Sequence, residues 1–236
     1  MGLFHSPKIA TDGLILNLDA GNTKSYPGSG NTWTDLSKEK NHATISNFAV
    51  GSLNGGTLTA NGATSSGFIN ASASLQSASI TMEVMIKPLD SGGSFSCVIS
   101  YPPNDDAHQS PYMIYAIYLT HAPWSGTGQL HTRIGGEAHY SAENVYEFGV
   151  WNHLVISFHN QAVKYYRDGV LKDTDTNSAA TISYSGYENQ NVMIGVNPNG
   201  GEDFEGEYSN VKLYNRALTD AEVKQNFEAI RGRFGL

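Results

Sequence analysis

Residues 151–171 read WNHLVISFHNQAVKYYRDGVL. Apolar residues dominate 152–158 and recur along 162–167, and polar residues separate the two runs at Asn160-Gln161. Asp168-Gly169 follows, flanked by hydrophobic residues, and this is among the strongest short signals for a tight hairpin because both central residues must adopt positive φ. The stretch therefore predicts an antiparallel meander of three strands.

Short apolar or alternating runs continue outward from this meander in both directions, separated by Gly, Asn, Ser and Pro. Leu14–Asp19 is one such run, and Ile80–Lys87 alternates with a period of two residues. Tyr112–His121 is apolar at successive positions, as a central strand covered on both faces would be. No repeat or linker interrupts the pattern, so we expect a short N-terminal arm over residues 1–12 and one domain over residues 13–236.

One helix is predicted, over residues 219–231. Thr219 and Glu222 have the spacing of a capping box, in which the Thr hydroxyl and the Glu carboxylate each accept from the other residue's amide. Leu218 and Val223 can form the hydrophobic staple, and Gly232 is the expected stop.

Composition excludes several classes of partner. The chain has 14 basic and 22 acidic residues among 236, a formal charge of −8, and no cluster of Lys and Arg, so we expect no nucleic acid as a partner. No apolar stretch is long enough for a signal peptide or for a membrane span, so we expect no membrane insertion. Cys97 is the only cysteine and lies in an apolar run, which favours a small buried hydrophobe over a reactive thiol.

Three stretches resemble the laminin-G-like branch of the concanavalin A-like jelly rolls, and the resemblance spans residues 12–231. They are DGLILNLDAGN with the following SYPGSG and WTDLS (12–37), WNHLVI with KYYRDG (151–169), and EGEYSNVKLYNRALTDAEV (205–223). The last is the most specific, because YNRALT before a capped helix is a frequent closing signature of the family. The first is most similar to versions in tailed-phage structural proteins, marine cyanophages among them.

The resemblance implies an all-β, two-sheet antiparallel jelly-roll sandwich with one short C-terminal helix, in which the N-terminal strand pairs near the final one. It implies function only loosely, because the same fold carries lectins, hydrolases, lyases, adhesion modules and virion proteins.

Catalysis is not expected from the carboxylates. Hydrolases of this fold carry two acidic residues on one strand, spaced so that both point into one cleft. The nearest candidate here is Glu202-Asp203-Phe204-Glu205, whose spacing is wrong and whose Gly-rich surroundings indicate a loop. The Arg and Gln-x-His signatures of the lyases are also missing. We therefore predict that the chain is not an enzyme.

A glycan site needs aromatic platforms with polar groups around them. The richest region is the loop 101–108 with the strands and loops that follow it. We predict a glycan site from these residues: Asp105, Asp106, Tyr112, Trp124, His131 and Arg133, with Tyr140 nearby. The alternative for Trp124 is that its ring folds back on the sandwich edge.

Calcium is the one cofactor that the sequence allows us to predict, because calcium prefers oxygen ligands and the chain is rich in side chains that carry oxygen. Asp19 ends the first predicted strand and Glu207 enters the last, so the two carboxylates should come close if those strands are neighbours. The alternative is that Asp19 caps a turn and that Glu207 is solvated.

Two interpretations of function remain open. The first is a non-catalytic virion structural or adhesion protein, such as a capsid decoration, fibre or tail-associated module. Its partners would be other virion proteins or further copies of itself in a homo-oligomer, and it could bind cell-surface glycan. The alternative is a carbohydrate-binding module or a degraded glycoside hydrolase or polysaccharide lyase, secreted or on the cell surface of a marine bacterium. Oligomeric state separates the two most cheaply.

Overall fold

The predicted meander is present and forms one end of a sheet. It consists of β12 (Asn152–His159), β13 (Ala162–Arg167) and β14 (Val170–Asp175). Asn160 and Gln161 both have positive φ, as do Asp168 and Gly169, so both turns have the backbone conformation that tight hairpins require. The computed structural model describes residues 8–51, 56–103, 112–121, 128–176, 178–198 and 201–236.

The meander belongs to the first of two sheets, which has eight strands in the described residues. The order is β14-β13-β12-β7-β16-β5-β4, and β1 pairs with β16 beside β5. The remaining strands of this sheet are β1 (Leu14–Asp19), β4 (Ala49–Gly51), β5 (Thr57–Asn61), β7 (Ile80–Pro88) and β16 (Glu205–Tyr214). The expected pairing of the N-terminal strand with the final one is therefore confirmed.

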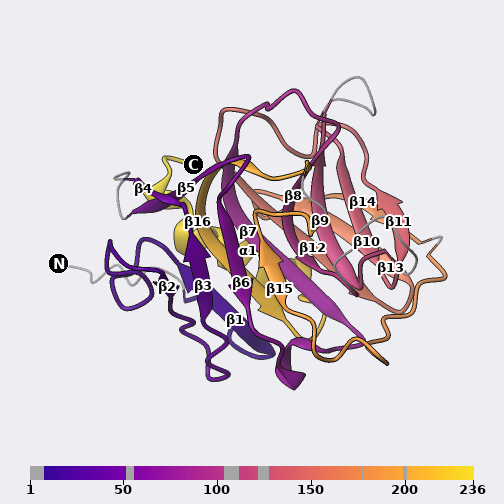
Figure 1. Cartoon of the computed structure of the whole chain (residues 1–236). Coiled ribbons are helices and arrows are strands. Elements are labelled where there is room, and N and C mark those ends of the chain that lie inside the picture. Colours follow the sequence, from indigo (N-terminus) through magenta and orange to yellow (C-terminus); the bar gives the residue numbers. More distant parts are fainter. Residues whose placement is uncertain (1–7, 52–55, 104–111, 122–127, 177, 199–200) are drawn as a thin grey trace.

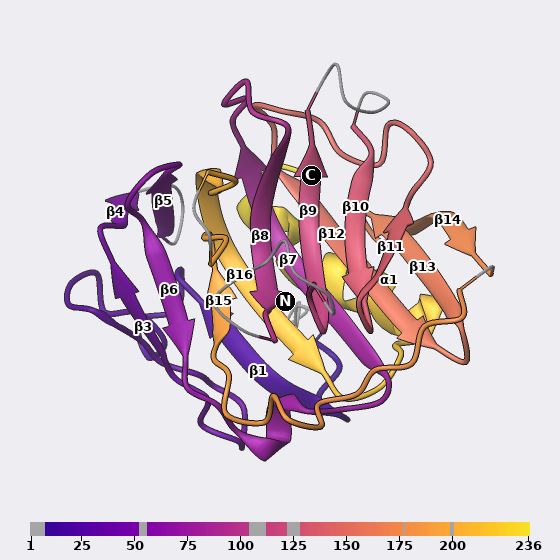
Figure 2. The ribbon, with the colours of Figure 1, turned by 45° about the vertical axis from the view of Figure 1, so that its right-hand side comes forward.

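The second sheet also has eight described strands, in the order β11-β10-β9-β8-β15-β6-β3-β2. They are β2 (Thr32–Trp33), β3 (Ala43–Ser46), β6 (Ser66–Ile69), β8 (Phe95–Tyr101), β9 (Tyr115–Thr120), β10 (Leu130–Ile134), β11 (Glu137–Tyr140) and β15 (Val192–Ile194). The two sheets face each other, and turning the molecule keeps them as separate layers (Figures 1 and 2). The predicted two-sheet antiparallel sandwich is confirmed.

The main core lies between the sheets. From β7 it receives Ile80, Met82, Val84 and Ile86, the four residues that the alternation places on one face. β9 is buried along its whole length, as predicted for a central strand, although it is shorter than the apolar run around it. Cys97 in β8 is buried as predicted, and burial raises the pKa of its thiol to about 12. Its thiol is therefore protonated and unreactive near neutral pH.

The helix α1 (Asp220–Ile230) covers the outer face of the first sheet (Figures 1 and 2). Its capping box is present, with Thr219 accepting from the amide of Glu222 and Glu222 accepting from the amide of Thr219. Leu218 and Val223 share a buried cluster with residues of that sheet, as the predicted staple requires. The helix ends at Ile230, two residues before Gly232, and continues as the 3₁₀ turn η2 (Arg231–Arg233). A second 3₁₀ turn, η1, spans Ala73–Leu75.

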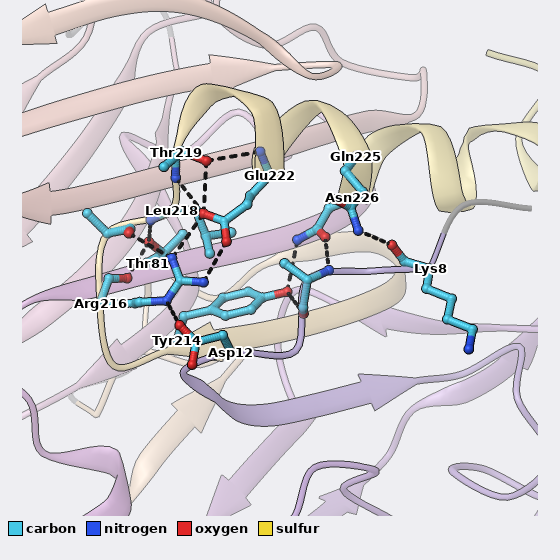
Figure 3. Close-up of polar contacts among 12 residues, drawn as sticks. Lys8, Asp12, Thr81, Tyr214, Arg216, Leu218, Thr219, Glu222, Gln225 and Asn226 are labelled. Atoms are coloured by element: carbon cyan, nitrogen blue, oxygen red, sulfur yellow. Dashed lines mark hydrogen bonds and ion pairs between the residues drawn. The ribbon is translucent and has the colours of Figure 1, made fainter.

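The segment before β1 docks against this helix. The amide of Ala10 donates to Oδ1 of Asn226 at 2.7 Å, and Gln225 donates to the carbonyl of Lys8 (Figure 3). Arg216 also links the segment before β1 to the helix, because it pairs with Asp12 and with Glu222 of α1. Residues 8–12 are thus joined to the C-terminal helix and to Arg216 through side-chain contacts. None of the helices in the described residues is long and apolar enough to cross a membrane.

Candidate functional site

An aromatic ladder runs across the outer face of the second sheet, on strands β8 to β11. The antiparallel register places His131 of β10 opposite Tyr118 of β9 and opposite Tyr140 of β11, and Tyr118 opposite Cys97 of β8. The His131 ring stacks on Tyr140 with centroids 4.6 Å apart and an interplanar angle of 9°, and on Tyr118 at 5.4 Å and 24°. Phe95 closes the ladder, 5.1 Å from His131.

His131 is the least satisfied polar group of this ladder. Its side chain is 5% exposed, and neither Nδ1 nor Nε2 has a hydrogen-bond partner among the described residues. Burial, with the charges of Arg133 and His139, lowers the pKa of His131 to about 3. The ring is therefore neutral near pH 7 and holds one donor and one acceptor. Leaving such groups unpaired costs about 1–3 kcal/mol, so a polar molecule that reaches them binds favourably.

Arg133 lies two residues along the same strand face. Its guanidinium carbon is 4.5 Å from the centre of the Tyr112 ring, a cation–π contact, and Nη1 donates to the carbonyl of Gly136 at 3.3 Å. Tyr112 has φ of +50°, a conformation that L residues rarely adopt, and its side chain is 37% exposed. The Tyr112 ring is thus held over Arg133 by a strained backbone and faces solvent.

These side chains line a pocket of about 190 Å³. Glu202 is among the lining residues. Its carbonyl accepts from the amide of Cys97, and its Oε2 accepts from Nδ2 of Asn197 at 2.6 Å. The full lining is Phe95, Tyr112, Met113, Tyr118, His131, Arg133, Tyr140 and Glu202. The volume is below the usual range for drug-sized ligands and suits one small ring with polar edges.

The pocket brings together part of the predicted glycan site. Tyr112, His131 and Arg133 line it, and so does Tyr140. Trp124, Asp105 and Asp106 lie outside the described residues. Sequence reasoning missed Phe95, Met113, Tyr118 and Glu202. Phe95 and Tyr118 read as core residues of buried strands, and only the strand register, with side chains alternating between the two faces, places them beside His131.

Asp19 and Glu207, the predicted calcium ligands, are held by different partners. Both oxygens of Asp19 accept from Nη1 of Arg233, at 2.9 and 3.1 Å, and Oδ1 also accepts from the amide of Gly21. Glu207 accepts from the hydroxyl of Thr57 and lies 3.7 Å from Nζ of Lys87. The described residues contain no group of three or more His, Cys, Asp or Glu that could hold a metal ion. Each of the two carboxylates thus has its own cationic partner in this arrangement, and the calcium site stays a prediction.

Ser96, His121 and Asp90 form a second polar cluster, in the hydrogen-bond order of a catalytic triad. Ser96 Oγ is 2.8 Å from His121 Nε2, and His121 Nδ1 is 2.9 Å from Asp90 Oδ1. Ser96 and His121 are each 1% exposed. These hydrogen bonds connect Asp90, which follows β7, to Ser96 of β8 and to His121, which follows β9.

Glu83, His153, Lys212 and Asn226 form a third cluster, between the first sheet and α1. Oε1 of Glu83 accepts from Lys212 at 2.8 Å and lies 3.1 Å from Nε2 of His153. Oε2 accepts from Asn226 at 2.6 Å. All four residues are at most 2% exposed, so this cluster is enclosed and offers no binding surface.

Comparison with known proteins agrees with this architecture. A laminin G-type family model, described as the concanavalin A-like lectin/glucanases superfamily, matches residues 61–224. Human usherin is 34% identical over 79 residues, which are 33% of this chain and 2% of usherin. The chain therefore spans only a small fraction of that relative's length.

Two solved structures are similar in fold. Domain 4 of AbnA, a GH43 extracellular arabinanase from Geobacillus stearothermophilus in complex with arabinotriose, has a TM-score of 0.68 at 20% identity, over 92% of this chain and 99% of that one. Trypanosoma rangeli sialidase has a TM-score of 0.67 at 15% identity, over 95% of this chain and 34% of that one. At these identities the similarity concerns the fold.

These neighbours correct one sequence-based prediction. The missing carboxylate pair led us to predict that the chain is not an enzyme. That prediction is contradicted, because the similar structures are parts of an arabinanase and a sialidase, both of them enzymes. A search for one acidic motif is too narrow a criterion for a fold that occurs inside enzymes of different chemistry.

Proposed function

Because the chain belongs to the concanavalin A-like lectin/glucanases superfamily, we propose that its pocket on the outer face of β8 to β11 binds a carbohydrate. The observation that carries the proposal is the stacked ladder around His131, whose two ring nitrogens lack partners among the described residues. Sugar rings have apolar faces that pack on aromatic rings and hydroxyl edges that need donors and acceptors. Tyr112 and Tyr140 supply exposed rings, and His131 and Arg133 supply polar groups beside them.

The AbnA domain supports the same proposal in a neighbour of nearly the same length, since that structure contains arabinotriose. The size of the pocket favours recognition of a single sugar residue within a longer glycan. In this proposal the chain acts as a glycan-recognition module.

Binding to a glycan array, followed by calorimetry with the best ligand, tests the proposal. Tyr140→Ala removes an exposed platform, and His131→Phe keeps a stacked ring while removing both nitrogens. Each substitution is expected to weaken binding at least about tenfold, by analogy with hot-spot residues of interfaces. Tyr187→Ala is the matched control, because Tyr187 is partly buried and packs against the core away from the pocket. Unchanged binding in both pocket variants, or no binding by the wild type, contradicts the proposal. Trp124→Ala tests the predicted platform outside the described residues.

We infer a second candidate setting, a virion structural or adhesion protein, from the likeness of residues 12–37 to phage structural proteins. In that setting the chain forms a homo-oligomer or binds other virion proteins, and the same pocket contacts cell-surface glycan. Light scattering tests this, because a fibre or decoration protein is expected to be a symmetric multimer. A monomer at micromolar concentration favours the alternative of a carbohydrate-binding module at the surface of a bacterium or in its surroundings.

A further inference from the structure

Among the residues that the structure describes, Arg133 differs from the other arginines in its charge partners. The sequence has five arginines, and four of them lie within ion-pair distance of a carboxylate. These pairs are Arg167 with Glu147 and Asp168, Arg216 with Asp12 and Glu222, Arg231 with Glu228, and Arg233 with Asp19. In the part of the chain that the structure describes, Arg133 has no such carboxylate. Its guanidinium therefore forms no ion pair among the described residues, although the protein as a whole has a net charge of −8 and Glu202 lines the same pocket.

The guanidinium is also placed to receive a ligand. It is partly buried, it is held by the Tyr112 ring and by one hydrogen bond to Gly136, and it lines the pocket. A guanidinium has five N–H donors, so most of its donors have no protein acceptor among the described residues. Its planar fork matches two oxygens of a carboxylate or sulfate, and such charge-assisted pairs are about twice as strong as neutral hydrogen bonds.

We propose that the pocket selects an acidic sugar, whose carboxylate or sulfate pairs with Arg133 while its ring packs against the aromatic ladder. This inference rests on the proposed carbohydrate function and adds the charge of the ligand to it. Neutral His131 then meets hydroxyl groups of the ligand, and Arg133 alone supplies the positive charge.

Glu202 also lines the pocket, and its charge opposes this selection. Its carboxylate accepts from Asn197, which is a neutral donor, so its negative charge is not cancelled by that contact. A negative charge in the same pocket lowers the affinity for anions. Neutralising it is therefore expected to strengthen binding of acidic sugars while leaving neutral sugars unaffected, which gives a test that does not disturb Arg133.

The experiment uses matched pairs of oligosaccharides that differ only at C6. Oligogalacturonate is compared with the corresponding galactose oligomer, oligoglucuronate with the glucose oligomer, and galactose 6-sulfate oligomers provide the sulfate arm. The wild type is expected to bind at least one acidic oligomer roughly tenfold or more tightly than its neutral partner, with an affinity that falls as NaCl rises. Comparing the affinities for the uronate oligomers and the sulfated oligomers shows whether the pocket prefers a carboxylate or a sulfate.

Three variants complete the test. Arg133→Gln is expected to remove the acid preference, roughly a ten- to hundredfold loss on the acidic oligomer with little change on the neutral one. Arg133→Lys keeps the positive charge but loses the planar guanidinium. Its affinity for the acidic oligomer should therefore lie between those of the wild type and Arg133→Gln. Glu202→Gln should bind the acidic oligomer more tightly. Arg231→Gln, whose arginine lies in the C-terminal turn and pairs with Glu228, is the control and should match the wild type.

The outcomes separate the two proposals. Equal binding of neutral and acidic oligomers overturns the charge selection and leaves the carbohydrate function in place. Binding of neither kind overturns both. If Arg133→Gln does not fold, the Glu202→Gln variant tests the charge selection instead. The selection is contradicted if this variant binds the acidic oligomers no more tightly than the wild type does.

Discussion

The ammonium of Lys212 lies 2.8 Å from Oε1 of Glu83, and both side chains are almost completely excluded from solvent. Lys212 comes from β16 and Glu83 from β7, two neighbouring strands in which the two residues are register partners. The helix α1 covers the pair through Asn226, and β12 adds His153. A buried charge is tolerated only when it is paired and hydrogen-bonded, and here the carboxylate has three partners.

Lys212→Met is therefore expected to be strongly destabilising. It leaves the Glu83 carboxylate buried without its cation, which costs about 3–5 kcal/mol in the free energy of unfolding. Lys164→Met is the matched control, because Lys164 pairs with Asp220 where both side chains are well exposed, and such a pair contributes no more than about 1 kcal/mol. Urea unfolding measures both. The double variant Glu83→Leu with Lys212→Met should recover much of the loss, and a loss equal to the sum of the single effects would show that the pair is not coupled.

Acid should reduce stability through the same carboxylate. Burial by itself raises the pKa of Glu83, but the positive charge of Lys212 and the hydrogen bond from His153 outweigh it and lower the pKa to about 2 from the usual 4.5. A lowered folded-state pKa means that the contribution is complete above about pH 4.5 and is lost as pH falls toward 2. The contribution is on the order of 3 kcal/mol.

Urea midpoints at pH 7, 4 and 3 for the wild type and Glu83→Gln test this dependence. The variant is less stable at pH 7 but should lose less between pH 7 and pH 3 than the wild type does. Parallel profiles for the two proteins would mean that the acid sensitivity arises at other carboxylates, such as Glu222, whose pKa is also lowered to about 2, chiefly by its hydrogen bond from Arg216.

The hairpin between β10 and β11 depends on Gly135. Its φ is +57°, and a Cβ at this position would lie 2.4 Å from the carbonyl oxygen of Thr181. Gly135→Ala should therefore destabilise the fold by at least about 2 kcal/mol, since strain and a backbone clash combine. It should also weaken glycan binding, because this turn sets the register that places His131 opposite Tyr140.

Gly149→Ala is the control for that variant. Gly149 also has positive φ, but a Cβ at this position would have nothing within 4 Å, so only the conformational cost of about 1 kcal/mol remains. Thermal and urea unfolding compare the two. Equal destabilisation of both variants would show that the approach of Thr181 has no energetic consequence.

The sequence alone determined the features whose causes lie within a few residues. The capping box of Thr219 and Glu222 and the turns at Asn160-Gln161 and Asp168-Gly169 are all present where predicted. Each depends on contacts or dihedral angles within about four residues, so the order of the residues contains the needed information. The alternation of Ile80–Lys87 likewise identified the face of β7 that enters the core.

The tertiary structure decided which distant residues meet. His131, Tyr118 and Tyr140 form one ladder because three strands share a register, and residues 97, 118, 131 and 140 carry no local signal of that pairing. In the sequence Glu83 is a lone carboxylate on an alternating strand, where it could equally face water. Its partners come from β12, β16 and α1, separated from it by 70, 129 and 143 residues. The packing of a helix on the outer face of the sheet removes water from this carboxylate, and only that packing makes its charge depend on Lys212, His153 and Asn226.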